Sequence, residues 1–304
     1  MDDVKTLDHY VRKALEFLEK SGSYTLRLPE SRMTLVTGSQ NGYQTGRILY
    51  GFGRGRLFVH EPEALAFDRI ESNSGSIDDV TIVTATGSRD VVAIAGDALR
   101  NGLRVNAVVC RHDSPLERQF GKRLNIIHVP SIEEPPTVNV ATYGRMIQGI
   151  THEDPKKISH LLDSFDKCSG KIIGFDQFTI LLPGTMPEIA AMADWKSGEL
   201  FGRQRHVRVF YAAGYMHGAG VTEGEKECYI SLGFQNNDFG RPENRIDIPV
   251  PEGFGPLGYM MSSYYILGMI QKAKGDTLFQ SNIADYYGRM KGWYPDGRSS
   301  RSLI

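Results

Sequence analysis

Residues 78–114 constrain the fold more than any other part of this sequence. Their apolar and polar positions predict, in order, a strand (Val80 to Val83), a polar turn (Thr84 to Ser88), a helix (Asp90 to Arg100) and a second strand (Arg104 to Val109), with Gly102 as the C-cap of the helix. Two strands joined by a helix at this spacing pair in parallel through a right-handed crossover. The segment therefore predicts an α/β fold built on a mainly parallel sheet flanked by helices.

The same alternation of strands and helices occurs in both halves of the chain. Before this segment, a strand is expected at Met33 to Val36, followed by a Gly-rich turn and a helix. Later in the chain, a strand is expected at Phe178 to Leu182 and a helix at Pro187 to Gly202. The Pro-containing, partly charged stretch 131–157 breaks both patterns and is expected to be an interdomain linker or crossover. The 304 residues fit two domains of about 150 residues each.

Charge and cysteine content exclude several classes of function. Lys and Arg number 35 against 36 Asp and Glu, a formal net charge of −1, whereas nonspecific nucleic-acid binding needs a net basic surface. The 3 cysteines are widely spaced and form no CxxC motif or Cys/His cluster, which argues against disulfides and structural zinc. The amphipathic start of the chain has neither the apolar core of a signal peptide nor the length of a membrane span. A protein of the reducing cytoplasm, without nucleic-acid or membrane partners, is expected.

Two polar turns are candidates for anion binding, because each follows a predicted strand and opens a predicted helix. They are residues 37–42, Thr-Gly-Ser-Gln-Asn-Gly, and residues 84–90, Thr-Ala-Thr-Gly-Ser-Arg-Asp. Free backbone N–H groups and the helix dipole favour an anion at such a turn. The side chains that can add hydrogen bonds belong to Ser39, Thr84, Thr86, Ser88 and Arg89. Either turn alone is better explained by ordinary N-capping, but two in one domain, one with an arginine, favour a phosphate or sulfonate site. Neither matches the Walker A or GxGxxG pattern.

The polar residues that could carry acid–base chemistry lie in the second half of the chain. Lys196 and Glu199 are three residues apart on a predicted helix and share one face. They form either a surface ion pair or a pair in which Glu199 is a general base protected from water. His217 follows the strand expected in HVRVFYAAG and lies among small residues that would let a ligand approach its imidazole. A structural role for this histidine is equally open.

Together these motifs resemble the sugar isomerase (SIS) domain family, which includes the archaeal phosphoglucose/phosphomannose isomerases and the isomerase half of glucosamine-6-phosphate synthase. The turn TATGSRD, with the helix and strand after it, looks like the family's Ser-x-Ser-Gly-x-Thr phosphate turn, and TGSQNG is similar to its Gly-Thr-Ser turn. The segments KSGE, YAAGYMHG and PDGRSSRSL resemble the family's Lys-x-x-Glu helix, its Tyr-Ala-Ala-Gly-Glu-Leu-Lys-His-Gly stretch and its tail. The resemblance implies two tandem SIS-type domains (24–152 and 158–290) and a C-terminal tail (291–304), whereas the N-terminal helix (1–22) is predicted from apolar residues at three- or four-residue steps.

The resemblance also implies a role for individual residues. The residues that fall where the family holds the sugar phosphate are Gln40, Thr84, Thr86 and Arg89, with Ser39 beside them. Glu199, on the same helix face as Lys196, falls on the base that moves a proton between C1 and C2. His217 falls on the residue that opens the sugar ring, which relatives often take from the partner subunit. Arg301 stands where the family's tail has a lysine. Such an isomerisation proceeds through an enediol(ate) and needs neither a metal nor an organic cofactor.

The sequence departs from the family pattern at several of these places. Arg89 replaces the threonine that usually closes the phosphate turn, and around His217 the family's Glu and one further residue are missing. What the resemblance implies is an aldose–ketose isomerase, an intramolecular oxidoreductase of the glucose/mannose-6-phosphate isomerase type, working as a cytoplasmic homodimer. Two alternatives stay open: an amino-sugar phosphate deaminase/isomerase, and a non-catalytic sugar-phosphate-binding regulator.

Overall fold

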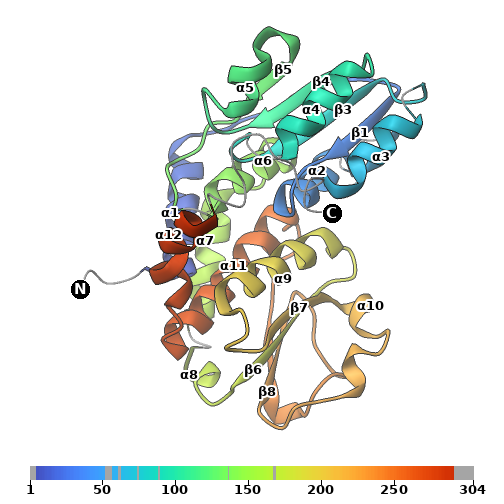
Figure 1. The fold of residues 1–304 in the computed structure, drawn as a ribbon. Coiled ribbons are helices and arrows are strands. Elements are labelled where there is room, and N and C mark those ends of the chain that lie inside the picture. Colours follow the sequence, from blue (N-terminus) through green and yellow to red (C-terminus); the bar gives the residue numbers. More distant parts are fainter. Residues whose placement is uncertain are drawn as a thin grey trace. The chain divides into compact units, whose positions relative to one another are not determined.

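The computed structural model describes residues 5–51, 57–60, 63–73, 75–87, 90–135, 137–166 and 169–290. Over these residues the chain is an α/β protein with two parallel sheets flanked by helices, as the sequence predicts (Figure 1). Its contacts divide it into two compact units. The first unit comprises the described parts of Met1–Gly22, Glu134–Gly144 and Thr151–Ile283. The second unit comprises the described parts of Ser23–Glu133, Arg145–Ile150 and Ala284–Ile304.

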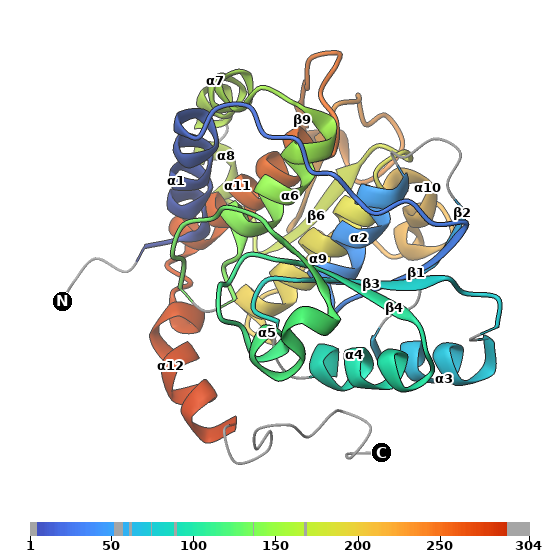
Figure 2. The ribbon, with the colours of Figure 1, turned by 90° about the horizontal axis from the view of Figure 1, so that it is seen from above.

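The second unit contains a five-stranded sheet in the order β2-β1-β3-β4-β5, with every neighbouring pair parallel. The strands are β1 (Met33–Thr37), β2 (Leu57–His60), β3 (Asp79–Thr84), β4 (Arg104–Val109) and β5 (Asn125–His128). The helices are α2 (Asn41–Gly51), α3 (Glu63–Asn73), α4 (Asp90–Arg100) and α5 (Pro115–Phe120). Figure 2 shows α3 and α4 along one face of the sheet and α2 on the other. Because both faces are covered, every residue of β3 is buried, including Asp79, Thr81 and Thr84.

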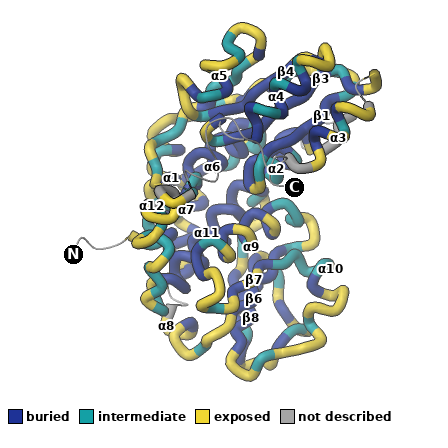
Figure 3. The backbone as a smooth tube through the Cα atoms, viewed as in Figure 1, coloured by how far each residue is buried: buried dark blue, intermediate teal, exposed yellow. Residues whose placement is uncertain are grey.

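The first unit contains a four-stranded parallel sheet in the order β7-β6-β8-β9. The strands are β6 (Gln177–Leu182), β7 (Val207–Tyr211), β8 (Glu227–Leu232) and β9 (Arg245–Ile248). Its helices are α1 (Leu7–Lys20), α7 (Pro155–Phe165), α8 (Ser169–Ile172), α9 (Pro187–Phe201), α10 (Ala212–Tyr215) and α11 (Pro256–Lys274). The long helix α11 is buried along most of its length (Figure 3). Among the described residues, no helix combines the length and the apolar character needed to cross a membrane.

The stretch 131–157, which the sequence predicts to be an interdomain linker or crossover, has no helix or strand among the described residues of 131–139 but contains helix after that. Helix α6 (Val140–Thr151) occupies its centre and α7 begins at Pro155. Pro155 is the first residue of α7, where a missing N–H costs nothing, and Asp154 caps the helix by accepting from Lys156 N–H at 2.9 Å. Helix α12 (Leu278–Met290) and strand β9 were also not predicted.

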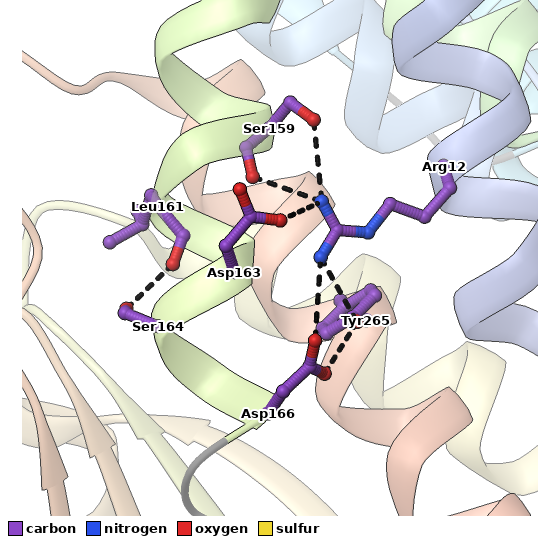
Figure 4. Close-up of polar contacts among 7 residues, drawn as sticks. All are labelled: Arg12, Ser159, Leu161, Asp163, Ser164, Asp166 and Tyr265. Carbon is purple, nitrogen blue, oxygen red and sulfur yellow. Dashed lines mark hydrogen bonds and ion pairs between the residues drawn. The ribbon is translucent and has the colours of Figure 1, made fainter.

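Helix α1 is joined to α7 and α11 through Arg12 (Figure 4). Its buried stripe consists of Leu7, Val11, Ala14, Leu15 and Leu18. The Arg12 guanidinium donates to the Ser159 carbonyl at 3.0 Å and to the Tyr265 hydroxyl at 3.2 Å, and it pairs with Asp163 at 2.8 Å. Its carbon lies 4.8 Å from the centre of the Tyr265 ring. A planar group with several fixed N–H bonds can make all these contacts at once.

Replacing Arg12 with alanine is expected to lower the free energy of unfolding by about 1–2 kcal/mol, mainly through the lost hydrogen bonds to Ser159 and Tyr265. The ion pair contributes little of this, because Asp163 is 62% exposed and exposed pairs are screened by solvent. Arg12→Lys keeps the charge but loses the planar guanidinium with its fixed N–H bonds. Its free energy of unfolding should therefore regain less than half of what Arg12→Ala loses. Urea unfolding of both variants measures this, and full recovery by lysine would show that charge alone matters.

Candidate functional site

The first polar turn connects β1 to α2, and Gly38 sets its shape. A Cβ atom at Gly38 would lie 2.3 Å from the backbone oxygen of Val83, so only glycine lets the turn approach β3 this closely. Gln40 adopts a left-handed φ of 45°, and the Gly42 N–H donates to the Ser39 carbonyl at 2.8 Å. Ser39 is half-buried and Gln40 is exposed. Both residues directly precede α2, whose first backbone N–H groups have no partner within the helix.

Buried polar atoms gather around this turn. Within the described chain, the side-chain oxygens of Thr37, Gln44 and Thr45 are buried without a hydrogen-bond partner. Thr37 ends β1, and Gln44 and Thr45 lie on the first turns of α2. A buried polar group without a partner costs about 1–3 kcal/mol. Their concentration at the carboxyl end of β1 fits a site for a polar ligand.

The second polar turn follows β3 and lies beside the first, because β1 and β3 are neighbouring parallel strands. The buried Thr84 hydroxyl oxygen accepts from the Gly87 N–H at 3.2 Å, so this hydroxyl supports the turn itself and still has its own proton to donate. Gly87 has φ of 62°, and a Cβ there would lie 2.9 Å from the Ser114 side chain. Thr86 is exposed. Ser88 and Arg89, which were predicted to complete this turn, lie outside the described residues.

Residues that sequence reasoning missed lie next to this turn. The N–H groups of Cys110 and Arg111 donate to the Ala85 carbonyl at 3.4 and 3.3 Å, which places the end of β4 against the turn. The His112 and His128 rings stack with centres 4.1 Å apart. Both histidines follow or end strands of the same sheet, so the rule that ligands bind at the carboxyl ends of parallel strands would have identified them.

Lys196 and Glu199 do not form a surface ion pair. The Lys196 side chain is 2% exposed and its ammonium donates to Glu199 Oε2 at 2.6 Å. The same ammonium donates to the Thr137 carbonyl at 2.5 Å and lies 6.0 Å from the centre of the Tyr264 ring. The Glu199 side chain keeps 21% of its surface exposed. The pair thus combines a buried cation, held by two hydrogen bonds, with a carboxylate that is partly exposed.

The segment before α6 was not recognised from the sequence as part of this site. The Glu134 carboxylate accepts hydrogen bonds from backbone N–H groups at the start of α6. Burial raises the pKa of Glu134, although these N–H groups and the Lys196 ammonium act in the opposite direction. A glutamate that precedes a helix by several residues carries no cap signature of the usual kind, so its sequence gave little signal.

His217 is exposed in the turn that follows α10. It was predicted to follow the strand directly, but the single helical turn of α10 separates it from β7, because the small residues Ala212, Ala213 and Gly214 continue as helix. Among the described residues, no hydrogen bond or ion pair involves its imidazole. Its imidazole is therefore open to solvent in this chain.

The loop that carries His217 is anchored by Tyr215. The Tyr215 ring is 2% exposed and packs 4.9 Å from the Phe239 ring, centre to centre. Its hydroxyl donates to the Tyr229 hydroxyl at 3.4 Å, which in turn donates to the buried Glu227 carboxylate at 2.9 Å. Burial, followed by the hydrogen bonds with Tyr215 and Glu227, raises the pKa of Tyr229. Tyr215 thus fixes the loop below His217, whose imidazole is exposed. This arrangement suits a residue that contacts a ligand at the surface.

The remaining predicted features are the tail arginine, the absence of a metal site and the assignment of the site residues to the two units. The tail arginine, Arg301, lies outside the described residues. Among the residues that are described, no three His, Cys, Asp or Glu side chains are placed to hold a metal ion. The predicted phosphate-binding residues belong to the second unit, and Lys196, Glu199 and His217 to the first.

Comparisons with known proteins bear on the fold. No protein-family model matches the sequence, and no curated protein matches it significantly. The structure resembles tagatose-6-phosphate ketose/aldose isomerase from Escherichia coli, with a TM-score of 0.61, 13% identity and coverage of 88% of both chains. It also resembles glucosamine-6-phosphate deaminase from Thermotoga maritima, with a TM-score of 0.57, 14% identity and coverage of 88% of this chain and 92% of that one.

A third likeness is to the C-terminal domain of glucosamine-fructose-6-phosphate aminotransferase from Francisella tularensis. Its TM-score is 0.55 at 11% identity, with 88% of this chain and 94% of that one covered. All three matches extend over nearly the whole length of both partners. The chain therefore shares the fold of solved proteins that include a sugar-phosphate isomerase, a sugar-phosphate deaminase and an aminotransferase domain.

Proposed function

We propose that the chain is a phosphosugar isomerase that interconverts aldose and ketose sugar phosphates at the hexose-6-phosphate level. The observation that carries this proposal is the buried Lys196–Glu199 pair, in which the cation is held on two sides and the carboxylate stays accessible. A carboxylate in that setting suits proton transfer between adjacent carbon atoms. The likeness to a tagatose-6-phosphate isomerase supports the reaction class. In this proposal the two units are tandem SIS-type domains.

The phosphate group is proposed to bind at the two polar turns. The proposed contacts are the backbone N–H groups at the start of α2 and the side chains of Ser39, Gln40, Thr84, Thr86, Ser88 and Arg89. The neighbouring strands β1 and β3 bring both turns to one edge of the sheet, and the unpaired oxygens around the first turn support a polar ligand there. Phosphate contacts of this kind bind and orient the sugar without taking part in the chemistry.

Glu199 is proposed to be the base. It removes the proton from C2 of the open-chain aldose, the C–H electron pair becomes the C1–C2 double bond, and the carbonyl electrons move to O1. Returning that proton to C1 while the O2 electrons form a carbonyl, with the O2 proton passing to O1, gives the ketose. The Lys196 ammonium uses two of its three N–H bonds in the contacts described and has one left for the developing negative charge. His217 is proposed to open the sugar ring, and Arg301 to occupy the place of the tail lysine. A cytoplasmic homodimer that needs no metal is part of the same proposal.

A panel of ligands tests this function directly. Hexose, pentose, amino-sugar and sulfonated-sugar anions are screened by thermal shift, since a ligand at 100 times its Kd stabilises the folded state by about 2.7 kcal/mol. Each binder is then followed by NMR for aldose–ketose conversion, in the presence and absence of a chelator. Turnover of a hexose 6-phosphate in both conditions is the expected result. Binding without turnover would instead favour the sugar-phosphate-binding regulator.

An amino-sugar phosphate deaminase/isomerase is the second candidate, because the fold is shared with a glucosamine-6-phosphate deaminase. The two functions differ in one product. A deaminase releases ammonia from an amino-sugar phosphate, whereas an isomerase conserves the nitrogen. Ammonia release measured with the amino-sugar member of the panel separates them.

Arg89→Ala is expected to weaken phosphosugar affinity by about 1.5–3 kcal/mol, because a charge-assisted hydrogen bond to phosphate is lost. Isothermal titration of the variant and of Arg100→Ala, an exposed arginine at the end of α4, provides the comparison. An Arg89 variant with unchanged affinity would remove this residue from the proposed phosphate site.

A further inference from the structure

The segment that precedes α6 is organised by the Glu134 carboxylate. The backbone N–H groups that donate to this carboxylate belong to Val140 at 2.9 Å, Ala141 at 3.0 Å and Thr142 at 3.3 Å. These are donors of the first turn of a 12-residue helix and have no partner within it. Glu134 therefore acts as the cap of α6, although it lies six residues before the helix begins.

The residues between this cap and the helix are held in an unfavourable backbone conformation. Thr137 has φ of 68° and Asn139 has φ of 49°. The left-handed region is rarely adopted by β-branched residues such as threonine, and a conformation of this kind persists only where the surrounding structure enforces it. Glu134 ties this loop to the start of α6. The loop turns the Thr137 carbonyl toward the Lys196 ammonium, which donates a hydrogen bond to it at 2.5 Å.

We propose that Glu134 is a positioning residue for the Lys196–Glu199 pair. By capping α6 it fixes the left-handed loop, the loop presents the Thr137 carbonyl, and this carbonyl holds the Lys196 ammonium in the place from which it orients Glu199. Glu134 touches neither Lys196 nor Glu199 through a hydrogen bond in this arrangement. Its effect on catalysis follows only if the proposed isomerase function holds, whereas its effect on Lys196 does not depend on turnover.

The electrostatics of the cluster support this arrangement. Lys196 is almost completely buried, and a buried cation is strongly disfavoured unless nearby negative charge and hydrogen bonds compensate it. Glu199 provides direct contact at 2.6 Å. The Lys196 ammonium also lowers the pKa of the Glu134 carboxylate, against the larger effect of burial, so the two groups are close enough to interact. The cation thus lies within reach of two carboxylates, one at the ligand side and one at the helix cap.

Chemical labelling of Lys196 tests the proposal without any substrate. Reductive dimethylation followed by peptide mass spectrometry measures the reactivity of each lysine in the folded full-length protein, with the exposed Lys156 as an internal reference. In the wild type we expect Lys196 to be protected. In Glu134→Gln the amide oxygen can still accept from Val140 and Ala141, but the charge is lost and the amide nitrogen faces the Thr142 N–H. The cap is weakened, and Lys196 should react at least about tenfold faster, as expected for one weakened charge-assisted hydrogen bond.

A matched control is available in the same unit. The Glu153 carboxylate caps α11 in the same manner, accepting from the N–H groups of Gly255 at 2.6 Å, Leu257 at 2.8 Å and Gly258 at 2.9 Å. Glu153→Gln therefore weakens a helix cap of the same kind without changing a hydrogen bond of Glu134 or of Thr137, and should leave Lys196 protected. Equal Lys196 labelling in both variants, or protection in a folded Glu134→Gln protein, would overturn the proposal. If Glu134→Gln does not fold, Glu134→Asp, which shortens the cap by one methylene, gives the same decision.

Steady-state kinetics adds a readout that general destabilisation would not move. Glu134→Gln should lower kcat by about 10- to 100-fold, since a small displacement of a catalytic group costs this much, while KM stays within about twofold because the phosphate contacts are untouched. Glu153→Gln should leave both parameters near the wild-type values. Unchanged kcat with labelled Lys196 would refute the positioning role. A wild type that turns over no phosphosugar would refute the proposed function and leave the labelling result as the test of the Glu134–Lys196 link.

Discussion

Glu199→Gln should lower kcat for hexose 6-phosphate isomerisation by at least about 1,000-fold, because a general base contributes on the order of 10²–10⁴ in rate. KM should change little, since glutamine has the same shape and its carbonyl oxygen can still accept from Lys196, 2.6 Å from the present carboxylate oxygen. Two measurements apply: NMR detection of aldose–ketose conversion, and exchange of the substrate C2 proton in D₂O. Both should be lost together if Glu199 carries the proton.

A second carboxylate on the same helix provides the control for this experiment. Glu188 lies in the first turn of α9, two turns or more before Lys196, and Glu188→Gln should leave kcat within about twofold of the wild type. Retention of turnover by Glu199→Gln within tenfold of the wild type would assign the base to another residue. Loss of ligand binding in that variant would instead show that Glu199 holds the sugar rather than its proton.

Gly268→Ala should destabilise the protein by about 3 kcal/mol, the upper part of the range for overpacking. A Cβ atom at Gly268 on α11 would lie 1.9 Å from the backbone nitrogen of Asp8 and 2.7 Å from its Cα. Backbone atoms cannot rotate away as a side chain does, so α1 would have to move off α11 and uncover its stripe of leucine and valine. Urea unfolding followed by circular dichroism measures the loss.

A glycine-to-alanine substitution at a more open helix position should have the opposite effect on stability. Gly198 on α9 is exposed, and no atom beyond its own helix lies within 4 Å of a Cβ placed there. Gly198→Ala is expected to stabilise the protein by up to about 1 kcal/mol, because alanine is the better helix former. If Gly268→Ala were as stable as the wild type, the close packing of α1 against α11 would be wrong.

The strands and polar turns of the second unit follow from local sequence, and their prediction is confirmed where the structure describes them. The predicted bounds of α4 and β4 agree with the structure at both ends. Aliphatic runs, a Gly-containing turn and a charged helix end are all short-range signals. Gly38 is visible in the sequence as part of a turn. The need for glycine at this position, however, comes from a backbone oxygen of the neighbouring strand, which leaves no room for a Cβ atom.

The parts that sequence reasoning missed depend on contacts between distant residues. Prolines 135 and 155 indicate a break in the chain, but Pro155 starts a helix and Glu134 caps another from outside it. The burial of Lys196 was not predictable from its apolar neighbours, because its partner is a carbonyl 59 residues earlier. Long-range hydrogen bonds of this type leave no periodic trace in the sequence, whereas the identity of Lys196 and Glu199 as a candidate pair was visible from their spacing.

The packing of α1 on α11 has a consequence for how the protein is made. Asp8 and Gly268 are in contact distance although about 260 positions separate them, and at roughly 5–20 residues per second a ribosome needs on the order of 10–50 s to cover that interval. Throughout this time the apolar stripe of α1 cannot yet pack on α11. The contact between these two helices is thus among the last in the first unit that can form during synthesis.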